Sequence, residues 1–202
     1  INIRGGTLNE DYLVLKSING TNGTFNAVNS IDQGNNSNWL INENPSATNC
    51  FWVSGTGNWS DPAHWALASG VAADPCVPGP SDNVVFDANS GTGFTTTVDV
   101  HSYCNNMTWV GVLGAPDLTG TNNLTLKGSM VLDAPMTASL SGVYEFVGLG
   151  AETITSDGVV LNGDVHFNHP TGSWSILDDL TSNALVQLDS GSFSTATNNM
   201  TI

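Results

Sequence analysis

Large apolar residues recur at nearly constant spacing along the second half of the chain. One series stands 20 or 21 positions apart: Leu126, Phe146, Phe167 and Leu188. A second series recurs every 22 positions: Leu132, Ile154 and Ile176. Around them apolar and polar residues alternate, as in a β-strand, whose successive side chains point to opposite faces. A repeat of about 20 residues is too short for paired helices and fits one coil of a β-helix.

The spacing therefore predicts an all-β fold, a right-handed β-helix (β-solenoid) whose stacked coils share one apolar core. The phrase Asn-Asn-apolar-Thr-apolar occurs at 105–109, 122–126 and 198–202. Asparagines at the turns of successive coils can form hydrogen-bonded ladders, which satisfy polar groups that are otherwise costly to bury. An antiparallel β-sandwich is the alternative, because its turn spacing of about 8–12 residues overlaps with the same pattern.

Three sections of the chain differ in composition. Residues 1–48 hold short strand-like runs separated by Asn-Gly turns, and we expect them to be the end of a preceding β repeat. Residues 49–100 hold a cluster of tryptophans and four of the eight prolines, and we expect a Trp-rich cap that leads into the solenoid. Residues 101–202 are the expected β-solenoid. Both ends of the sequence read like strand interiors, so we expect a fragment of a longer protein.

The tryptophan cluster comprises Trp52, Trp59 and Trp65. Such side chains can stack on sugar rings, or they can cover the end of a solenoid core that would otherwise face water. A buried tryptophan contributes a large apolar area and needs one partner for its indole N–H. We favour the structural cap.

Charge excludes several classes of partner. The chain has 3 Lys and Arg against 18 Asp and Glu, a formal charge of −15. Nucleic-acid binding depends on cations that neutralise phosphates, so it is not expected. Anionic membrane surfaces are disfavoured for the same reason. No stretch approaches the roughly 20 apolar residues of a membrane-spanning helix, so membrane insertion is not expected either.

The three cysteines are Cys50, Cys76 and Cys104, without Cys-x-x-Cys spacing. A zinc site is therefore not indicated. One disulfide and one leftover thiol fit an exported protein. All three pairings are open, and we prefer Cys76–Cys104; three unpaired thiols are the alternative.

Asp32, Asp82 and Asp87 are the candidate calcium ligands, since acidic loops offer oxygen atoms to a hard cation. None has the spacing of an EF-hand, and solvated turns are the preferred interpretation. We expect no other cofactor. The adjacent pair Asp178 and Asp179 makes a poor acid–base couple, because neighbours on a strand point to opposite faces. A serine-nucleophile elbow is missing from the sequence, so no catalytic residues are assigned and we do not expect an enzyme.

Two segments, Phe51–Trp65 and Pro78–Asp87, carry a resemblance to a known family. The first reads Phe-Trp-Val-Ser-Gly-Thr-Gly-Asn-Trp-Ser-Asp-Pro-Ala-His-Trp, and the second Pro-Gly-Pro-Ser-Asp-Asn-Val-Val-Phe-Asp. They resemble a repeat module of giant secreted cell-surface proteins of Bacteroidota. That group includes SprB-type gliding-motility adhesins and other type IX secretion substrates.

The resemblance implies a non-catalytic stalk or adhesive segment, secreted and tethered at the outer membrane, with a role in adhesion or gliding motility. Its expected partners are neighbouring repeats of the same chain, surface glycans or other cell-surface proteins. The alternative function is a carbohydrate-binding or carbohydrate-cleaving β-helix, which predicts exposed, coplanar tryptophans along a groove.

Overall fold

A computed structural model gives the fold of residues 1–202, and all of them are described except 12, 29, 33–35, 43–47 and 75. Strands make up 47% of the chain and helix 2%, and the main body is a β-solenoid of about five turns. The predicted all-β fold and β-helix are confirmed. An antiparallel sandwich is wrong, because almost every strand pairs with a parallel neighbour about one coil away.

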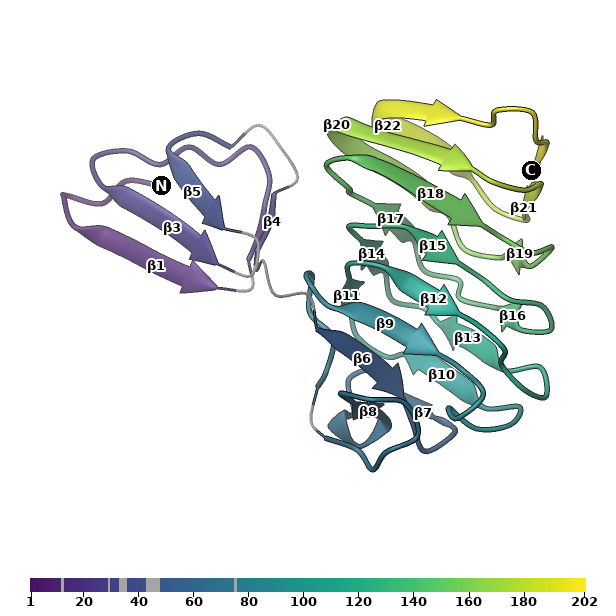
Figure 1. Cartoon of the computed structure of the whole chain (residues 1–202). Helices are drawn as coiled ribbons and strands as arrows, with labels where there is room; N and C mark the ends of the chain where they lie inside the picture. The colour runs from purple at the N-terminus through teal and green to yellow at the C-terminus, as the bar shows by residue number, and fades with distance from the viewer. Residues whose placement is uncertain (12, 29, 33–35, 43–47, 75) are drawn as a thin grey trace.

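Residues 48–202 form three stacks of parallel strands that surround one core (Figure 1). The first stack contains β6 (Asn49–Trp52), β9 (Asn83–Phe86), β12 (Met107–Trp109), β15 (Met130–Val131), β18 (Ala151–Thr155) and the second halves of β20 (Val165–Ile176) and β22 (Val186–Ser194). The second contains β7 (Gly57–Asn58), β10 (Thr95–Val98), β13 (Asp117–Gly120), β16 (Thr137–Ala138), β19 (Val160–Leu161), β21 (Leu180–Ser182) and β23 (Met200–Thr201). The third contains β11 (Ser102–Cys104), β14 (Leu124–Leu126), β17 (Tyr144–Phe146) and the first halves of β20 and β22.

The predicted series of 20 to 21 residues is the register of the third stack. Leu126 pairs with Phe146, Phe146 with Phe167, and Phe167 with Leu188. The rings of Phe146 and Phe167 lie 5.2 Å apart at an interplanar angle of 23°. One column of apolar side chains therefore runs through successive coils, as the spacing predicts.

The second predicted series is right in part. Ile154 pairs with Ile176 in the first stack. The partner of Ile154 in the preceding coil is Met130, whereas Leu132 lies two residues further along, where the chain leaves the stack. Both Met130 and Leu132 are buried, so the apolar spacing does not distinguish the strand residue from the corner residue.

The three Asn-Asn phrases open strands on three different faces, since they precede β12, β14 and β23. Asparagine side chains of each motif form hydrogen bonds to the coil before or after it. The Nδ2 atoms of Asn105 and Asn106 donate to Oδ1 of Asn83 at 3.0 and 2.9 Å, and Nδ2 of Asn83 donates to Asn49 at 3.0 Å. The expected asparagine ladder therefore exists, but it joins Asn49, Asn83 and the 105–106 pair rather than the repeated phrases to one another.

Glycine is required where coils approach closely at the corner before the third stack. A Cβ atom on Gly142 would lie 2.1 Å from the carbonyl oxygen of Asn122, and one on Gly163 would lie 2.1 Å from that of Gly142. Side chains at these positions would push stacked backbones apart. The two glycines thus keep the coils at the spacing of hydrogen-bonded strands, about 4.8 Å.

Residues 1–42 form a shorter parallel stack of their own. β1 (Thr7–Asp11), β3 (Thr24–Val28) and β5 (Trp39–Asn42) pair in that order, and β2 (Val14–Leu15) pairs with β4 (Ile31–Asp32). The Asn-Gly signals predict reverse turns, and Asn22 adopts a φ of 61°. These turns connect strands on different faces of a coil, so strands one coil apart run parallel.

The expected division of the chain at residue 100 lies inside one coil. β10 ends at Val98 and β11 begins at Ser102, and both belong to the same stacked body as β6 and β9. The solenoid therefore already includes the strands of the Trp-rich section.

Candidate functional site

The tryptophan cap, which comprises Trp52, Trp59 and Trp65, lies at the start of the main solenoid. All three side chains are at most 1% exposed. The rings of Trp52 and Trp65 meet edge to face at 5.0 Å, and those of Trp59 and Trp65 at 5.1 Å. Nε1 of Trp52 donates to the carbonyl of Gly55, and Nε1 of Trp65 to that of Trp59, both at 2.7 Å. The arrangement is that of a packed core end.

A short helix and a short antiparallel strand cover this end of the core. The 3₁₀ helix η1 (Pro62–His64) follows Asp61, whose carboxylate accepts the N–H of Ala63 at 2.9 Å. β8 (Trp65–Ala66) then pairs antiparallel with β6, unlike the parallel strands around it. The ring of His64 stacks on Trp52 at 4.9 Å. The first coil is therefore closed by a strand that reverses direction.

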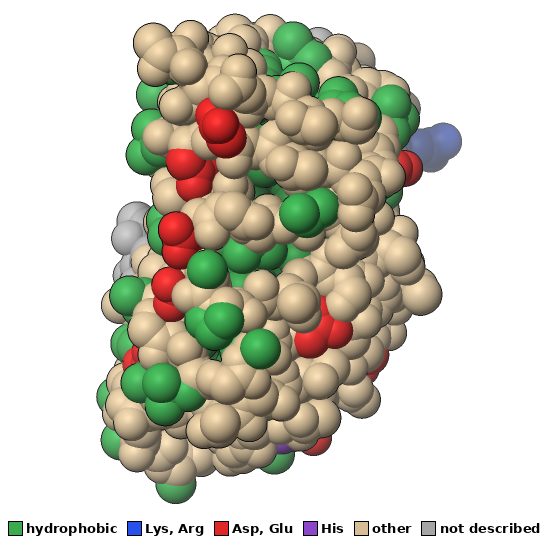
Figure 2. All heavy atoms as spheres, turned by 90° about the vertical axis from the view of Figure 1, so that its right-hand side faces the viewer, with side chains coloured by type: hydrophobic (Ala, Val, Ile, Leu, Met, Phe, Trp, Pro, Cys, Tyr) green, Lys and Arg blue, Asp and Glu red, His purple; other side chains and the backbone are tan. Residues whose placement is uncertain are grey.

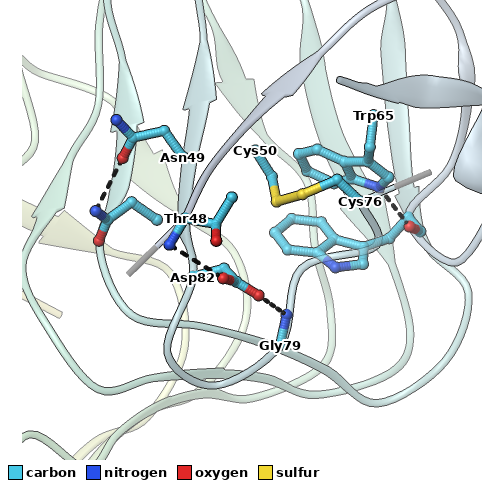
Figure 3. The surroundings of a disulfide bond; sticks show 9 residues. Thr48, Asn49, Cys50, Trp65, Cys76, Gly79 and Asp82 are labelled. Atoms are coloured by element: carbon cyan, nitrogen blue, oxygen red, sulfur yellow. Dashed lines mark hydrogen bonds between the residues drawn. A yellow bond between two sulfur atoms is a disulfide. The ribbon is translucent and has the colours of Figure 1, made fainter. Parts of the chain in front are cut away.

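The disulfide joins Cys50 to Cys76, so the predicted Cys76–Cys104 pair is wrong (Figure 3). Cys50 lies on β6, and its side chain is buried in the core at the first coil. Cys76 lies in the connecting segment between β8 and β9, which crosses the same capped end of the core. Cys104 lies on β11, buried in register with Leu126. The correct pairing could not be predicted from sequence separation, which does not show which end of the core the segment between β8 and β9 crosses.

We expect removal of the cross-link by the double change Cys50→Ala and Cys76→Ala to lower the free energy of unfolding by about 3 kcal/mol, because the link restricts a loop of 26 residues in the unfolded chain. Urea unfolding with and without reductant measures this. A Cys104→Ala variant is the control and should stay sensitive to reductant. Insensitivity of that variant would contradict the Cys50–Cys76 pairing.

Cys104 is the free thiol among the described residues and is fully buried. Burial raises the pKa of this thiol far above its usual range, since no charge offsets the loss of hydration. The thiolate is the reactive form of cysteine. Cys104 is accordingly a core residue without nucleophilic character near neutral pH.

The calcium candidates Asp82 and Asp87 bind protein donors. Asp82 accepts backbone N–H groups from Thr48 at 3.2 Å and from Gly79 at 2.9 Å, as Figure 3 shows. Asp87 accepts the N–H of Asn89 at 2.8 Å and the hydroxyl of Ser69 at 2.6 Å. The side chain of Asp32 lies outside the described residues. Within the described part of the chain no three metal-binding side chains gather, and calcium binding stays a prediction.

Carboxylates at the corners have a role that the sequence analysis missed: they accept backbone N–H groups from adjoining coils. Asp133 accepts from Val112 at 3.2 Å, Asp157 from Ala134 at 3.0 Å, and Asp178 from Ser156 at 2.8 Å. Backbone N–H groups of adjoining coils also donate to Asp99, Asp117, Asp164 and Asp179. Figure 2 shows carboxylates recurring from coil to coil on one side of the molecule. Asp133, Asp157 and Asp178 are spaced by about one coil length, and this spacing is the sequence feature from which their role could have been predicted.

These bonds explain how a chain with few cations holds so many carboxylates. A carboxylate that accepts a backbone N–H forms a charge-assisted bond without needing a lysine or arginine partner. The bond from Asn199 lowers the pKa of Asp179, because it stabilises the ionised form. Asp178 and Asp179 thus both join coils, since each accepts a backbone N–H of an adjoining coil.

The outward face of the third stack carries a polar network. The imidazole Nε2 of His101 lies 2.9 Å from Oγ1 of Thr125, which donates to Glu145 at 3.3 Å. Nδ2 of Asn168 also donates to Glu145, at 3.3 Å. The ring of His101 stacks on Tyr103 at 4.5 Å. Four coils are tied together on this face by side chains that sequence reasoning did not single out, because the bonds cross between coils.

His101 should make the fold sensitive to acid. Partial burial lowers the pKa of this imidazole, although Glu145 opposes the shift. Because the unfolded chain binds the proton first, near pH 6.5, stability should fall as the pH drops below that value toward the folded pKa. We expect His101→Gln to reduce this loss between pH 7 and 5, measured as the urea midpoint. A parallel pH dependence in both proteins would contradict it.

No helix among the described residues has the length and apolar character to cross a bilayer. No protein-family model matches the chain, and no curated protein or solved structure matches it either. The fold and the residue contacts are therefore the basis for any functional conclusion.

Proposed function

We propose that this chain is a non-catalytic structural segment of a secreted bacterial cell-surface protein, which serves as a stalk or adhesive spacer. The observation that carries the proposal is the continuous stacking of parallel coils on one apolar core. Each added coil lengthens such a body by about 4.8 Å without changing its cross-section. A fold of this kind is suited to spanning distance.

The disulfide supports the proposal that the protein is exported from the cytosol. Cys50 and Cys76 are bonded at the capped end of the core, and structural disulfides persist in oxidising compartments and are rare in the cytosol. The charge of −15 supports solubility at an exposed surface, since like-charged chains repel.

The carbohydrate-binding alternative requires indole faces that solvent can reach. Trp52, Trp59 and Trp65 are buried against one another, and Trp109 and Trp174 are each 1% exposed. A sugar ring cannot stack on a side chain enclosed in the core. The sixth tryptophan, Trp39, is half-buried, and its ring lies 5.1 Å from that of Phe25. The burial of the other five favours the structural proposal over the alternative.

Two measurements on the natural protein test the proposal. Thiol labelling of the denatured, unreduced protein should modify one cysteine of three, and an antibody against the chain should label intact cells. Three reactive thiols, or labelling only after the cells are permeabilised, would contradict export. Glycan binding that is lost in a folded Trp59→Ala variant would favour the carbohydrate-binding alternative.

A further inference from the structure

Asn-Gly pairs occur in the chain at 19–20, 22–23 and 162–163. Such a pair favours a tight turn, because both residues tolerate positive φ. Asparagine is also among the chemically labile residues, and it is most reactive before glycine, which has no side chain to keep its amide nitrogen away from the asparagine amide carbon. In a folded protein the reaction depends on how firmly each pair is held.

The first pair, Asn19-Gly20, is held by bonds to the following coil. Oδ1 of Asn19 accepts a hydrogen bond from Oγ of Ser37 at 2.8 Å and another from Nδ2 of Asn38 at 3.1 Å. The amide nitrogen of Gly20 donates to the carbonyl of Ser37 at 3.0 Å, and Gly20 is buried. Both reacting groups of this pair are therefore engaged.

The pair Asn162-Gly163 is held from both sides. Nδ2 of Asn162 donates to the carbonyl of Ala138 in the preceding coil, and its Oδ1 accepts from Nδ2 of Asn183 in the next coil, both at 2.9 Å. Gly163 is buried at the close approach of the coils. The side chain of Asn162 must break two bonds before it can turn toward the Gly163 nitrogen.

The pair Asn22-Gly23 is held by one side-chain bond. Nδ2 of Asn22 donates to Oδ1 of Asn2 at 3.2 Å. Among the described residues, the amide nitrogen of Gly23 donates no hydrogen bond. Both Asn22 and Gly23 are exposed. The nitrogen that would attack is thus free, and the group that it would attack is lightly held.

Unequal coil lengths explain the exposure of this pair. Asn19 pairs with Ser37, and Phe25 pairs with Trp39. The chain therefore advances six positions in one coil, from 19 to 25, beside two positions in the next, from 37 to 39. The longer coil must bulge between these paired positions, and Asn22-Gly23 lies in the bulge.

From this contrast we propose that Asn22 is a site of spontaneous deamidation. The amide nitrogen of Gly23 loses its proton to solvent and attacks Cγ of Asn22, the bond from Cγ to Nδ2 breaks, and Nδ2 leaves as ammonia. Water then adds to either carbonyl of the resulting cyclic imide and opens it, which gives aspartate or isoaspartate. The reaction consumes one water, releases one ammonia and adds one negative charge. The inference goes beyond the proposed function and does not depend on export.

The modification should loosen the contact between the first two coils. Deamidation removes the Nδ2 donor to Asn2 and places a carboxylate there instead. The backbone carbonyl of Asn22 also accepts the N–H of Gly5 at 2.7 Å. In isoaspartate the main chain runs through Cβ and Cγ, so this former carbonyl becomes part of a free carboxylate. We therefore expect the bond from Gly5 to open more often after conversion.

Peptide mass spectrometry of the folded 202-residue chain tests the proposal. The protein is aged in mildly alkaline buffer and digested in acid, and the replacement of an amide NH₂ by OH is followed at each pair. Asn22 should convert about tenfold faster than Asn19 or Asn162, because each of those must break at least one further hydrogen bond. In urea the three rates should converge, since the folded contacts are lost.

Asn22→Gln is the matched control, because it keeps the amide while its longer side chain closes a ring less readily. Its peptide should stay unconverted, and circular dichroism checks that the variant is folded. Equal rates at the three pairs in the folded protein would overturn the proposal, as would conversion of Asn22 only after unfolding.

Hydrogen exchange at the Gly5 amide tests the consequence for the coils. Exchange should become faster in the aged wild type and stay unchanged in aged Asn22→Gln. A Gly5 amide that remains equally protected once Asn22 is converted would contradict the expected loosening.

Discussion

Replacing Phe146 with alanine is expected to lower the free energy of unfolding by about 3–5 kcal/mol, enough to unfold much of a marginally stable domain. Phe146 is fully buried between Leu126 and Phe167 in adjoining coils. Its loss removes apolar contacts to both neighbours and leaves a cavity that a stack of fixed spacing cannot close. Urea unfolding followed by circular dichroism measures the change.

Leu188→Ala is the matched control for this prediction. Leu188 occupies the same column in the last coil, where it is 49% exposed. We expect a loss below about 1 kcal/mol, because only part of the side chain leaves water on folding. Equal losses at positions 146 and 188 would mean that the column does not continue through the coils.

A Trp52→Ala change should cost a similar 3–5 kcal/mol at the opposite end of the core. Trp52 contacts the rings of His64, Trp65 and Phe86 at centroid distances of 4.9, 5.0 and 5.8 Å. Truncation would open the capped end to water and leave the carbonyl of Gly55 without its indole donor. Urea unfolding measures the change.

Trp52→Phe serves as the control for the cap. It keeps most of the apolar contact and loses the indole hydrogen bond, so we expect a cost of about 1–2 kcal/mol. A Trp52→Ala protein with wild-type stability would show that the cap does not close the core.

The register of the third stack could be predicted because its coils have nearly constant length. A difference of 20 or 21 residues places Phe146 above Leu126 and Phe167 above Phe146. The same reasoning fails at Leu132, since apolar residues occupy both strands and corners. Repeated apolar positions therefore reveal the coil length more reliably than they reveal which residue lies in the strand.

Contacts between coils account for most of what the sequence did not show. From the sequence, the many carboxylates indicate only a net negative charge. In the structure, Asp133, Asp157 and Asp178 each accept a backbone N–H of another coil. The partner of Cys76 depends on the path of the excursion between β8 and β9 across the capped end. Neither feature follows from local sequence, because both depend on how the coils lie in three dimensions.

The most direct test of the stacked fold is a set of nuclear Overhauser contacts between backbone protons of paired strands. In a parallel stack the paired positions differ by a constant, so contacts should follow the register of Thr125, Glu145 and His166. In an antiparallel sandwich the paired positions have a constant sum. Contacts at a constant difference of about one coil are the predicted result, and contacts at a constant sum would contradict the β-solenoid.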